Sequence, residues 1–170
     1  VPAKDSPGFI ANRIGLYGVA QAIRALASGE YTVEEIDAIT GPALGRPRSA
    51  TFRTMDIAGL DILSHVAADL IARLPDAGSR EAYTLPPLVS TLLERGWIGE
   101  KAGQGFYKRA GAEILALDPA TVAYHPRASV RIPSLEGGNA DDPRARARAL
   151  FLAKDKAGAF LRGTLGPLLV

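Results

Sequence analysis

Cysteine is absent from the sequence, which excludes disulfide bonds, thiol nucleophiles and zinc–thiolate sites and fits a cytoplasmic protein. Long uncharged apolar runs are absent as well, because Arg13, Asp61 and Asp69 interrupt the two most hydrophobic segments. A strong excess of one charge is also missing, since the formal net charge is only +2. These absences predict a protein with no membrane span and no nucleic-acid partner.

The composition that remains is that of an ordinary globular protein. Hydrophobic residues make up 47% of the 170 positions and charged residues 22%, so one compact core is expected. The first residue is Val1 rather than methionine, and the residues after it have neither the apolar core nor the cleavage site of a signal peptide. We therefore interpret the chain as a piece of a longer protein.

Arginine is concentrated in one C-terminal stretch that has no interleaved aromatic side chains. Five residues form this basic cluster: Arg127, Arg131, Arg144, Arg146 and Arg148. A solvated surface is the simpler interpretation, and a docking face for the phosphates of an anionic cofactor is the alternative.

Helical spacing of apolar side chains dominates the first hundred residues. Four helices are expected, over residues 8–27, 32–41, 53–74 and 86–96. Their ends carry the usual signals: Ser6 and Pro7 precede the first helix, Thr32 and Glu35 form a capping box on the second, and Pro75 ends the third. The long first and third helices should form the body of the domain.

The residue pattern of the sequence changes after Gly96. Residues 106–117 are typical of a small β-hairpin, because two apolar stretches flank Ala110 and Gly111. Prolines are spaced through residues 118–140, which we expect to be a linker. The first helical domain is therefore predicted to end with the hairpin and to span residues 1–117.

The last thirty or so residues resemble the beginning of the chain. Residues 141–170 open with a predicted capped helix, and residues 154–158 share three of five identities with residues 4–8 at an offset of 150. We predict that 141–170 is the start of a second, truncated helical repeat. In that alignment Arg162 stands where the first copy has Asn12.

Asn12 is the most unusual polar residue of the first predicted helix. Its helical angle places it in the predicted buried stripe, one turn beyond Phe9. Asparagine interrupts helical hydrogen bonding and is costly to bury without partners. It is either a hydrogen-bonded core group or an amide that points at a ligand near the start of the helix, and its position alone leaves both open.

The two histidines, His65 and His125, are the candidates for a general base within the chain. His65 lies on the third predicted helix, where Asp61 and Asp69 at a spacing of four residues are typical of surface ion pairs. His125 precedes a proline in the expected linker. We assign neither histidine a catalytic role, and we expect no metal site.

Three sequence blocks resemble the C-terminal domain of 3-hydroxyacyl-CoA dehydrogenases, in that family's order. Residues 4–14 resemble its Asp-x-Pro-Gly-Phe-x-x-Asn-Arg signature, and blocks over 55–61 and 99–108 follow. Residues from 109 onward are similar to the linker and second helical repeat of long multifunctional fatty-acid-oxidation proteins. The resemblance implies a mainly α fold, 6-phosphogluconate-dehydrogenase C-terminal-like, with a small β-hairpin.

The resemblance also implies an activity, the NAD-dependent oxidation of a 3-hydroxyacyl-CoA to the 3-ketoacyl-CoA in fatty acid β-oxidation. In that family the catalytic histidine and its glutamate partner belong to an N-terminal Rossmann domain that is missing here. NAD would be bound mainly by that missing domain, because no Gly-x-Gly-x-x-Gly fingerprint follows a strand in this chain. We expect the chain alone to be inactive.

Two residues acquire family roles through the matching blocks. Asn12 matches the asparagine that faces the catalytic histidine and the substrate, where an amide supports catalysis by stabilising developing oxygen charge. Lys101 matches the lysine that reaches the nicotinamide side of bound NAD, although a solvated loop lysine is the simpler interpretation of that residue alone. The implied partners are 3-hydroxyacyl-CoA, the Rossmann domain and a second copy of the chain in a homodimer.

One loop departs from the family pattern. Family members often have Gly-x-Pro-x-Gly-Pro before the second block, whereas residues 45–52 lack the second Gly-Pro. The path of this loop and the preferred acyl length therefore stay open. Two other functions also stay open: the helical domain of another β-hydroxyacid dehydrogenase, and a non-catalytic helical dimerisation module.

Overall fold

The computed structural model describes residues 8–136 and 142–168. Its helices are α1 (Ile10–Ala27), α2 (Val33–Thr40), α3 (Phe52–Ala58), α4 (Leu60–Arg73), α5 (Ala77–Tyr83), α6 (Pro87–Glu94), α7 (Pro133–Glu136), α8 (Pro143–Leu152) and α9 (Lys156–Thr164). Short 3-10 turns are η1 (Pro42–Leu44), η2 (Glu100–Ala102) and η3 (Gly166–Leu168). Strands β1 (Tyr107–Ala110), β2 (Glu113–Asp118) and β3 (Ala123–Pro126) form an antiparallel sheet in that order. The helix-start signal predicted at Ser6 and Pro7 lies outside the described residues.

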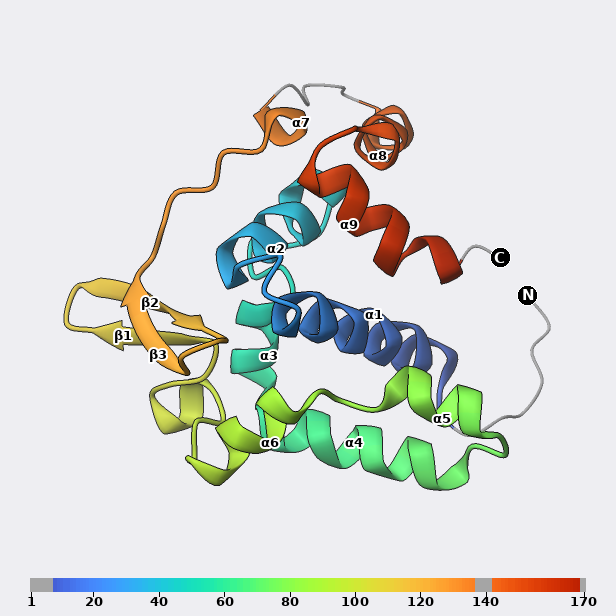
Figure 1. Ribbon diagram of the computed structural model, residues 1–170, viewed down its shortest axis with the longest axis vertical. Coiled ribbons are helices and arrows are strands. Elements are labelled where there is room, and N and C mark those ends of the chain that lie inside the picture. Colours follow the sequence, from blue (N-terminus) through green and yellow to red (C-terminus); the bar gives the residue numbers. More distant parts are fainter. Residues whose placement is uncertain (1–7, 137–141, 169–170) are drawn as a thin grey trace.

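Helix α1 is the central element of a mainly helical fold (Figure 1). Helices α4, α5 and α6 lie along one side of it, α2 and α9 lie on the other, and the small sheet lies beside α2 and α3. Buried side chains from the C-terminal half of α1, from α2, α3, α6, α9 and from the sheet meet in one hydrophobic core. The predicted mainly α class is confirmed. Within the described residues, no helix combines the length and the apolar character needed to cross a bilayer.

The single helix predicted over residues 53–74 is wrong, because α3 and α4 replace it. Gly59 separates them with a φ of 96°, a backbone conformation that favours glycine. The turn brings the Leu60 amide within 3.1 Å of the Ile98 carbonyl, so the glycine-rich segment after α6 is hydrogen-bonded to this junction. Apolar side chains recur at helical spacing on both sides of Gly59, and the periodicity therefore does not reveal the break.

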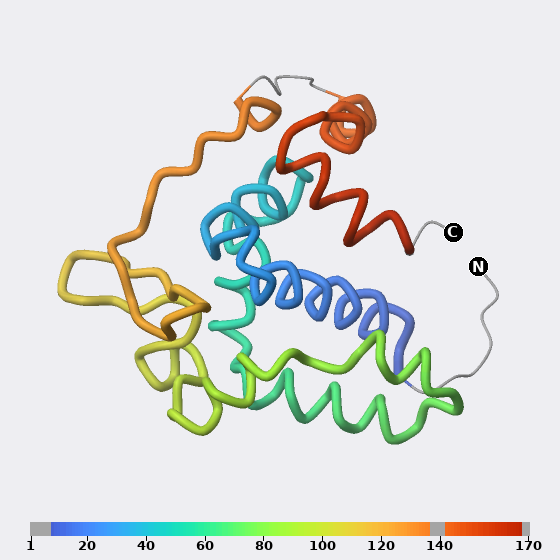
Figure 2. The backbone as a smooth tube through the Cα atoms, viewed as in Figure 1, coloured from blue at the N-terminus to red at the C-terminus, as the bar shows by residue number. Residues whose placement is uncertain are grey.

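The predicted hairpin is confirmed and is extended by one strand. Tyr107 of β1 lies opposite Ala116 of β2, and Leu117 of β2 lies opposite Tyr124 of β3. Strand β3 falls inside residues 118–140, so the expected linker is partly ordered secondary structure. From β3 the chain runs along the outside of the molecule to α7 (Figure 2).

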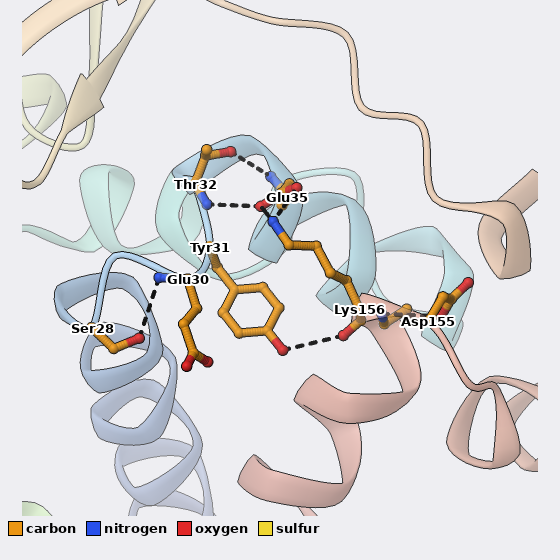
Figure 3. A network of polar contacts seen from close by, with 8 residues as sticks. Ser28, Glu30, Tyr31, Thr32, Glu35, Asp155 and Lys156 are labelled. Atoms are coloured by element: carbon orange, nitrogen blue, oxygen red, sulfur yellow. Dashed lines mark hydrogen bonds and ion pairs between the residues drawn. The ribbon is translucent and has the colours of Figure 1, made fainter.

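The C-terminal helices pack against the first ones through both apolar and polar contacts. The ring of Phe160 on α9 lies 5.3 Å from that of Tyr31, measured between centroids. Lys156 pairs with the Glu35 carboxylate at 2.8 Å, and the Tyr31 hydroxyl donates to the Lys156 carbonyl at 3.3 Å (Figure 3). Glu35 also accepts from the Thr32 amide and completes the predicted capping box of α2. That residues 141–170 begin a second repeat stays a prediction.

Candidate functional site

Asn12 lies on the same face of α1 as Leu16, because the two residues are four positions apart. Leu16 is only 5% exposed, whereas Asn12 is exposed. The predicted placement of Asn12 in a buried stripe is therefore wrong, because the core ends at Leu16, one turn before it reaches Asn12. The Asn12 side chain has no hydrogen-bond partner among the described residues, so its amide is open to a ligand or to another domain.

The start of α1 around Asn12 is an uncovered apolar surface. Phe9, the residue before the helix, is 81% exposed, and Ile10 and Ile14 are each more than half exposed. Large apolar side chains grouped in this way are typical of a surface that another protein or domain covers. Asn12 shares a face of the helix start with Phe9, three positions before it, whereas Ile10 and Ile14 lie on the other side. A polar amide beside an exposed aromatic ring is suited to a site shared between two domains.

Asp56 on α3 is the anchor of the glycine-rich segment that follows α6. Its carboxylate is buried and accepts hydrogen bonds from the backbone amides of Phe106 and Tyr107, each at 2.8 Å. A Cβ atom at Gly105 would overlap this carboxylate, and one at Gly99 would overlap the Asp56 carbonyl, so glycine is required at both positions. Burial raises the pKa of Asp56 to about 6 in spite of these hydrogen bonds.

Lys101 lies in η2, on the turn that Asp56 holds in place. Its ammonium group donates to the Asp61 carboxylate at 2.6 Å, in the first turn of α4. This hydrogen bond lowers the pKa of Asp61. The Lys101 side chain remains 48% exposed, and an ammonium has three N–H donors, so Lys101 keeps donors for a further partner.

Asn12 and Lys101 do not form one cluster, because they lie toward opposite ends of α4. Gly8, just before α1, lies against Leu70 of α4, whereas Lys101 contacts Asp61. Nine residues of helix separate these two contacts, which corresponds to about 13 Å. A ligand that touches both residues must therefore extend along α4, as a large cofactor or a substrate together with a cofactor would.

Among the described residues, neither His65 nor His125 forms a hydrogen bond or an ion pair with Asn12. His65 is exposed on α4. His125 has one ring nitrogen 2.9 Å from the Pro126 carbonyl oxygen and 3.9 Å from the Glu34 carboxylate. In the described part of the chain, no three acidic or histidine side chains gather in the manner of metal ligands.

Asp37 on α2 is a second buried anchor, and the sequence analysis missed it. Its carboxylate accepts from the backbone amides of Thr51, Phe52 and Arg53 and from the Tyr107 hydroxyl at 2.9 Å. Burial raises the pKa of Asp37 in spite of these four donors. These bonds fix the end of the loop over residues 45–52, the one that departs from the family pattern. The available signal was an acid between two isoleucines on the apolar face of a short helix.

These features define a mainly helical domain that presents polar side chains on an uncovered apolar surface and on an anchored glycine-rich turn. A family model described as "3-hydroxyacyl-CoA dehydrogenase, C-terminal domain" matches residues 8–109, which include Asn12, Asp56 and Lys101. The chain belongs to this family.

Similar proteins carry names from the same family. A Bacillus subtilis protein described as a 3-hydroxyacyl-CoA dehydrogenase is 46% identical over 162 residues, which are 95% of this chain and 20% of that protein. A Rickettsia prowazekii protein described as a fatty acid oxidation complex trifunctional enzyme is 28% identical over 137 residues, which are 78% of this chain and 19% of that protein. The crystal structure of Mycobacterium tuberculosis FadB2 matches with a TM-score of 0.56 and 32% identity, and the match covers 65% of this chain and 37% of that one. The chain therefore spans about a fifth of the length of the Bacillus and Rickettsia relatives.

Proposed function

We propose that this chain is the substrate-side domain of an NAD-dependent 3-hydroxyacyl-CoA dehydrogenase, which oxidises 3-hydroxyacyl-CoA to 3-ketoacyl-CoA in fatty acid β-oxidation. The observation that carries the proposal is the exposed Asn12 amide at the start of α1, the end of the helix that also exposes Phe9. Membership of the family and the name of the Rickettsia relative support the reaction and its metabolic setting.

Asn12 has the chemistry that such a reaction needs from this side of the site. Its amide N–H groups are donors, and a donor aimed at an oxygen on which negative charge develops stabilises the transition state more than the ground state. Loss of one such donor costs roughly 10²–10³ in rate. The catalytic base would come from the Rossmann domain that we expect in the whole protein and that would cover Phe9 and Ile10.

Lys101 fits a contact with NAD, which supplies the hydride acceptor of the reaction when it is bound. The lysine is half exposed, its turn is anchored by Asp56, and it retains N–H donors beyond the one given to Asp61. A ribose hydroxyl or a phosphate oxygen would accept from these donors. Lys101 alone offers one contact, so most of the NAD affinity would come from the other domain.

The decisive experiment compares substrates with the intact protein that contains this chain. We expect NAD reduction, followed by absorbance, with 3-hydroxyacyl-CoA and not with the matching free 3-hydroxy acid. Oxidation of the free acid instead would identify the helical domain of another β-hydroxyacid dehydrogenase. Absence of both reactions would favour a dimerisation module without catalytic duty.

We also propose that the intact protein forms a homodimer. The exposed side chains Ile57 on α3 and Ile62 on α4 support this proposal, because large exposed apolar side chains are typical of a surface that a second copy covers. Light scattering on the intact protein measures its mass in solution, and a monomer at all concentrations would contradict the proposal.

A further inference from the structure

A groove of about 760 Å³ opens between α2, η2 and the sheet, and cationic side chains dominate its walls. They come from the loop before α3, from α3, from β1 and from the segment after β3: Arg48, Arg53, Lys108, Arg109 and Arg127. Its two acidic side chains are Asp37 and Glu100. Neither Asn12 nor Lys101 lines the groove, but Glu100 and Gly103 on the Lys101 turn do, so the groove borders that turn.

The negative charges of the groove are already compensated within the protein. Asp37 receives four hydrogen bonds, including that of the Tyr107 hydroxyl. Glu100 forms an ion pair with Arg53 at 2.9 Å. In contrast, Arg48 and Arg109 have no acidic partner among the described residues and are exposed. The groove therefore keeps an excess of positive charge that a bound anion would neutralise.

Two of the cations are held in place by aromatic rings. The Arg127 guanidinium lies 5.8 Å from the centre of the Tyr107 ring, and the Lys108 ammonium lies 5.6 Å from that of Tyr124. A stacked guanidinium keeps its N–H edges free for hydrogen bonds, and it loses less conformational freedom when it binds. The Asp37 hydrogen bond fixes the Tyr107 hydroxyl, so the platform under Arg127 is rigid.

We propose that this groove binds a small molecule that carries phosphate groups on an organic body of nucleotide size. Guanidinium groups match phosphate oxygens in charge and in geometry. Ala38, Pro42 and Ile114 supply an apolar wall for the organic body. The volume lies within the range of roughly 300–1,000 Å³ found for small-molecule sites. Such an anion has two sources, the nucleotide part of a coenzyme A ester or a free nucleoside diphosphate.

Isothermal titration calorimetry tests the proposal on the 170-residue chain, because the intact dehydrogenase would also bind the probes at its substrate and NAD sites. The probes are coenzyme A, ADP and pantetheine, which lacks phosphate groups. We expect heat of binding with coenzyme A, with ADP or with both, none with pantetheine, and weaker binding as salt is raised. Binding of coenzyme A alone would assign the groove to the substrate's nucleotide part, whereas binding of both would assign it to nucleotide diphosphates in general.

Charge-matched variants separate a built site from diffuse attraction. Arg109→Gln and Arg127→Gln should each weaken binding roughly tenfold, because each removes a charge-assisted hydrogen bond. Arg148→Gln removes the same charge from the exposed face of α8, outside the groove, and should leave the affinity unchanged. All three side chains are exposed, so circular dichroism should show an unchanged fold.

Two outcomes would overturn the proposal. The first is the absence of binding by both phosphate-carrying probes. The second is equal weakening by Arg148→Gln, which would show that only net charge attracts the ligand. Titrations of the 170-residue chain need neither turnover nor a cofactor site on another domain, so their result is independent of whether the intact protein is a dehydrogenase.

Discussion

Asn12 is the single residue on which the proposed catalytic role of this chain depends. In the intact protein, Asn12→Ala should lower kcat by roughly 10²–10³, because the alanine has no donor for the developing oxygen charge. The side chain is exposed and without a partner in the described part of the chain, so the free energy of unfolding should change by less than about 0.5 kcal/mol. Steady-state NAD reduction and urea denaturation measure the two effects.

Gln21 provides the matched control, because it carries the same amide on a later turn of α1. Gln21→Ala should leave kcat unchanged. An Asn12→Ala enzyme that turns over normally would remove Asn12 from the mechanism, and an equal loss of kcat in both variants would show that α1 itself is perturbed.

Asp56 gives the chain a defined dependence of stability on pH. Its pKa is about 6 in the folded protein against an ordinary 3.8, so the folded state binds this proton more tightly than the unfolded state. The contribution of the group to stability is therefore fully present below about pH 4 and is lost as the pH rises through about 6. Relative to Asp56→Asn, the free energy of unfolding of the unmodified chain should fall by on the order of 3 kcal/mol between these limits.

Urea denaturation at a series of pH values measures this difference. Asp56→Asn should also be less stable at neutral pH, because the amide nitrogen cannot accept from one of the two backbone N–H groups. Asp69→Asn, on the exposed face of α4, is the surface control. Parallel pH profiles for Asp56→Asn and the unmodified chain would show that Asp56 titrates at its ordinary value.

At the scale of elements, the junction between α3 and α4 depends on Gly59. Gly59→Ala should lower the free energy of unfolding by about 1–3 kcal/mol, because alanine is strained at a φ of 96°. In addition, a Cβ atom there would lie 2.7 Å from the Asp61 carboxylate and would disturb its pair with Lys101. Thermal and urea unfolding of the chain measure the loss.

Gly15 in the middle of α1 is the opposite case and serves as the control. A Cβ atom at Gly15 meets no atom within 4 Å, and the residue is in a helix interior. Gly15→Ala should therefore stabilise the chain by about 0.5–1 kcal/mol. If both glycine variants changed stability in the same direction, the junction at Gly59 would have no special conformational requirement.

At the scale of the whole molecule, short-range sequence signals predicted the helices and the hairpin better than they predicted strand pairing and side-chain burial. The capping box of α2, the end of α1 at Ala27 and the hairpin follow from short-range sequence signals. Strand β3 was not predicted, because its pairing with β2 depends on a partner rather than on its own pattern. The predicted burial of Asn12 was wrong, since burial depends on which other element covers that face of the helix.

The Lys101 turn and the cationic groove also differ in how far the sequence predicts them. Lys101 was predicted because it belongs to a continuous block, over residues 99–108. The groove that we propose to bind phosphate groups was not predicted, because its cationic side chains are distant in sequence and only the fold brings them together. Of the basic cluster singled out in the sequence, Arg127 alone lines the groove, and Arg144 and Arg148 are solvated on α8.

The packing of α9 predicts that the described parts of the chain unfold as one cooperative unit. Phe160 is buried in the same core as Ile23 of α1 and contacts the ring of Tyr31. Phe160→Ala should lower the free energy of unfolding of the whole chain by about 3–5 kcal/mol, with a single transition by circular dichroism and by tyrosine fluorescence. Leu152→Ala, at a largely exposed position of α8, should have little effect.

An independent C-terminal unit would behave differently. Phe160→Ala would then melt α8 and α9 in a separate early transition, while the signal of the remaining helices kept the midpoint of the unmodified chain. Because the Lys156 side chain is half exposed, the contribution of its pair with Glu35 is at most about 1 kcal/mol and does not by itself couple the two parts. Cooperativity therefore has to come from the apolar contact of Phe160 with Tyr31 and its neighbours, and the two-probe melting curve of this single variant decides between one unit and two.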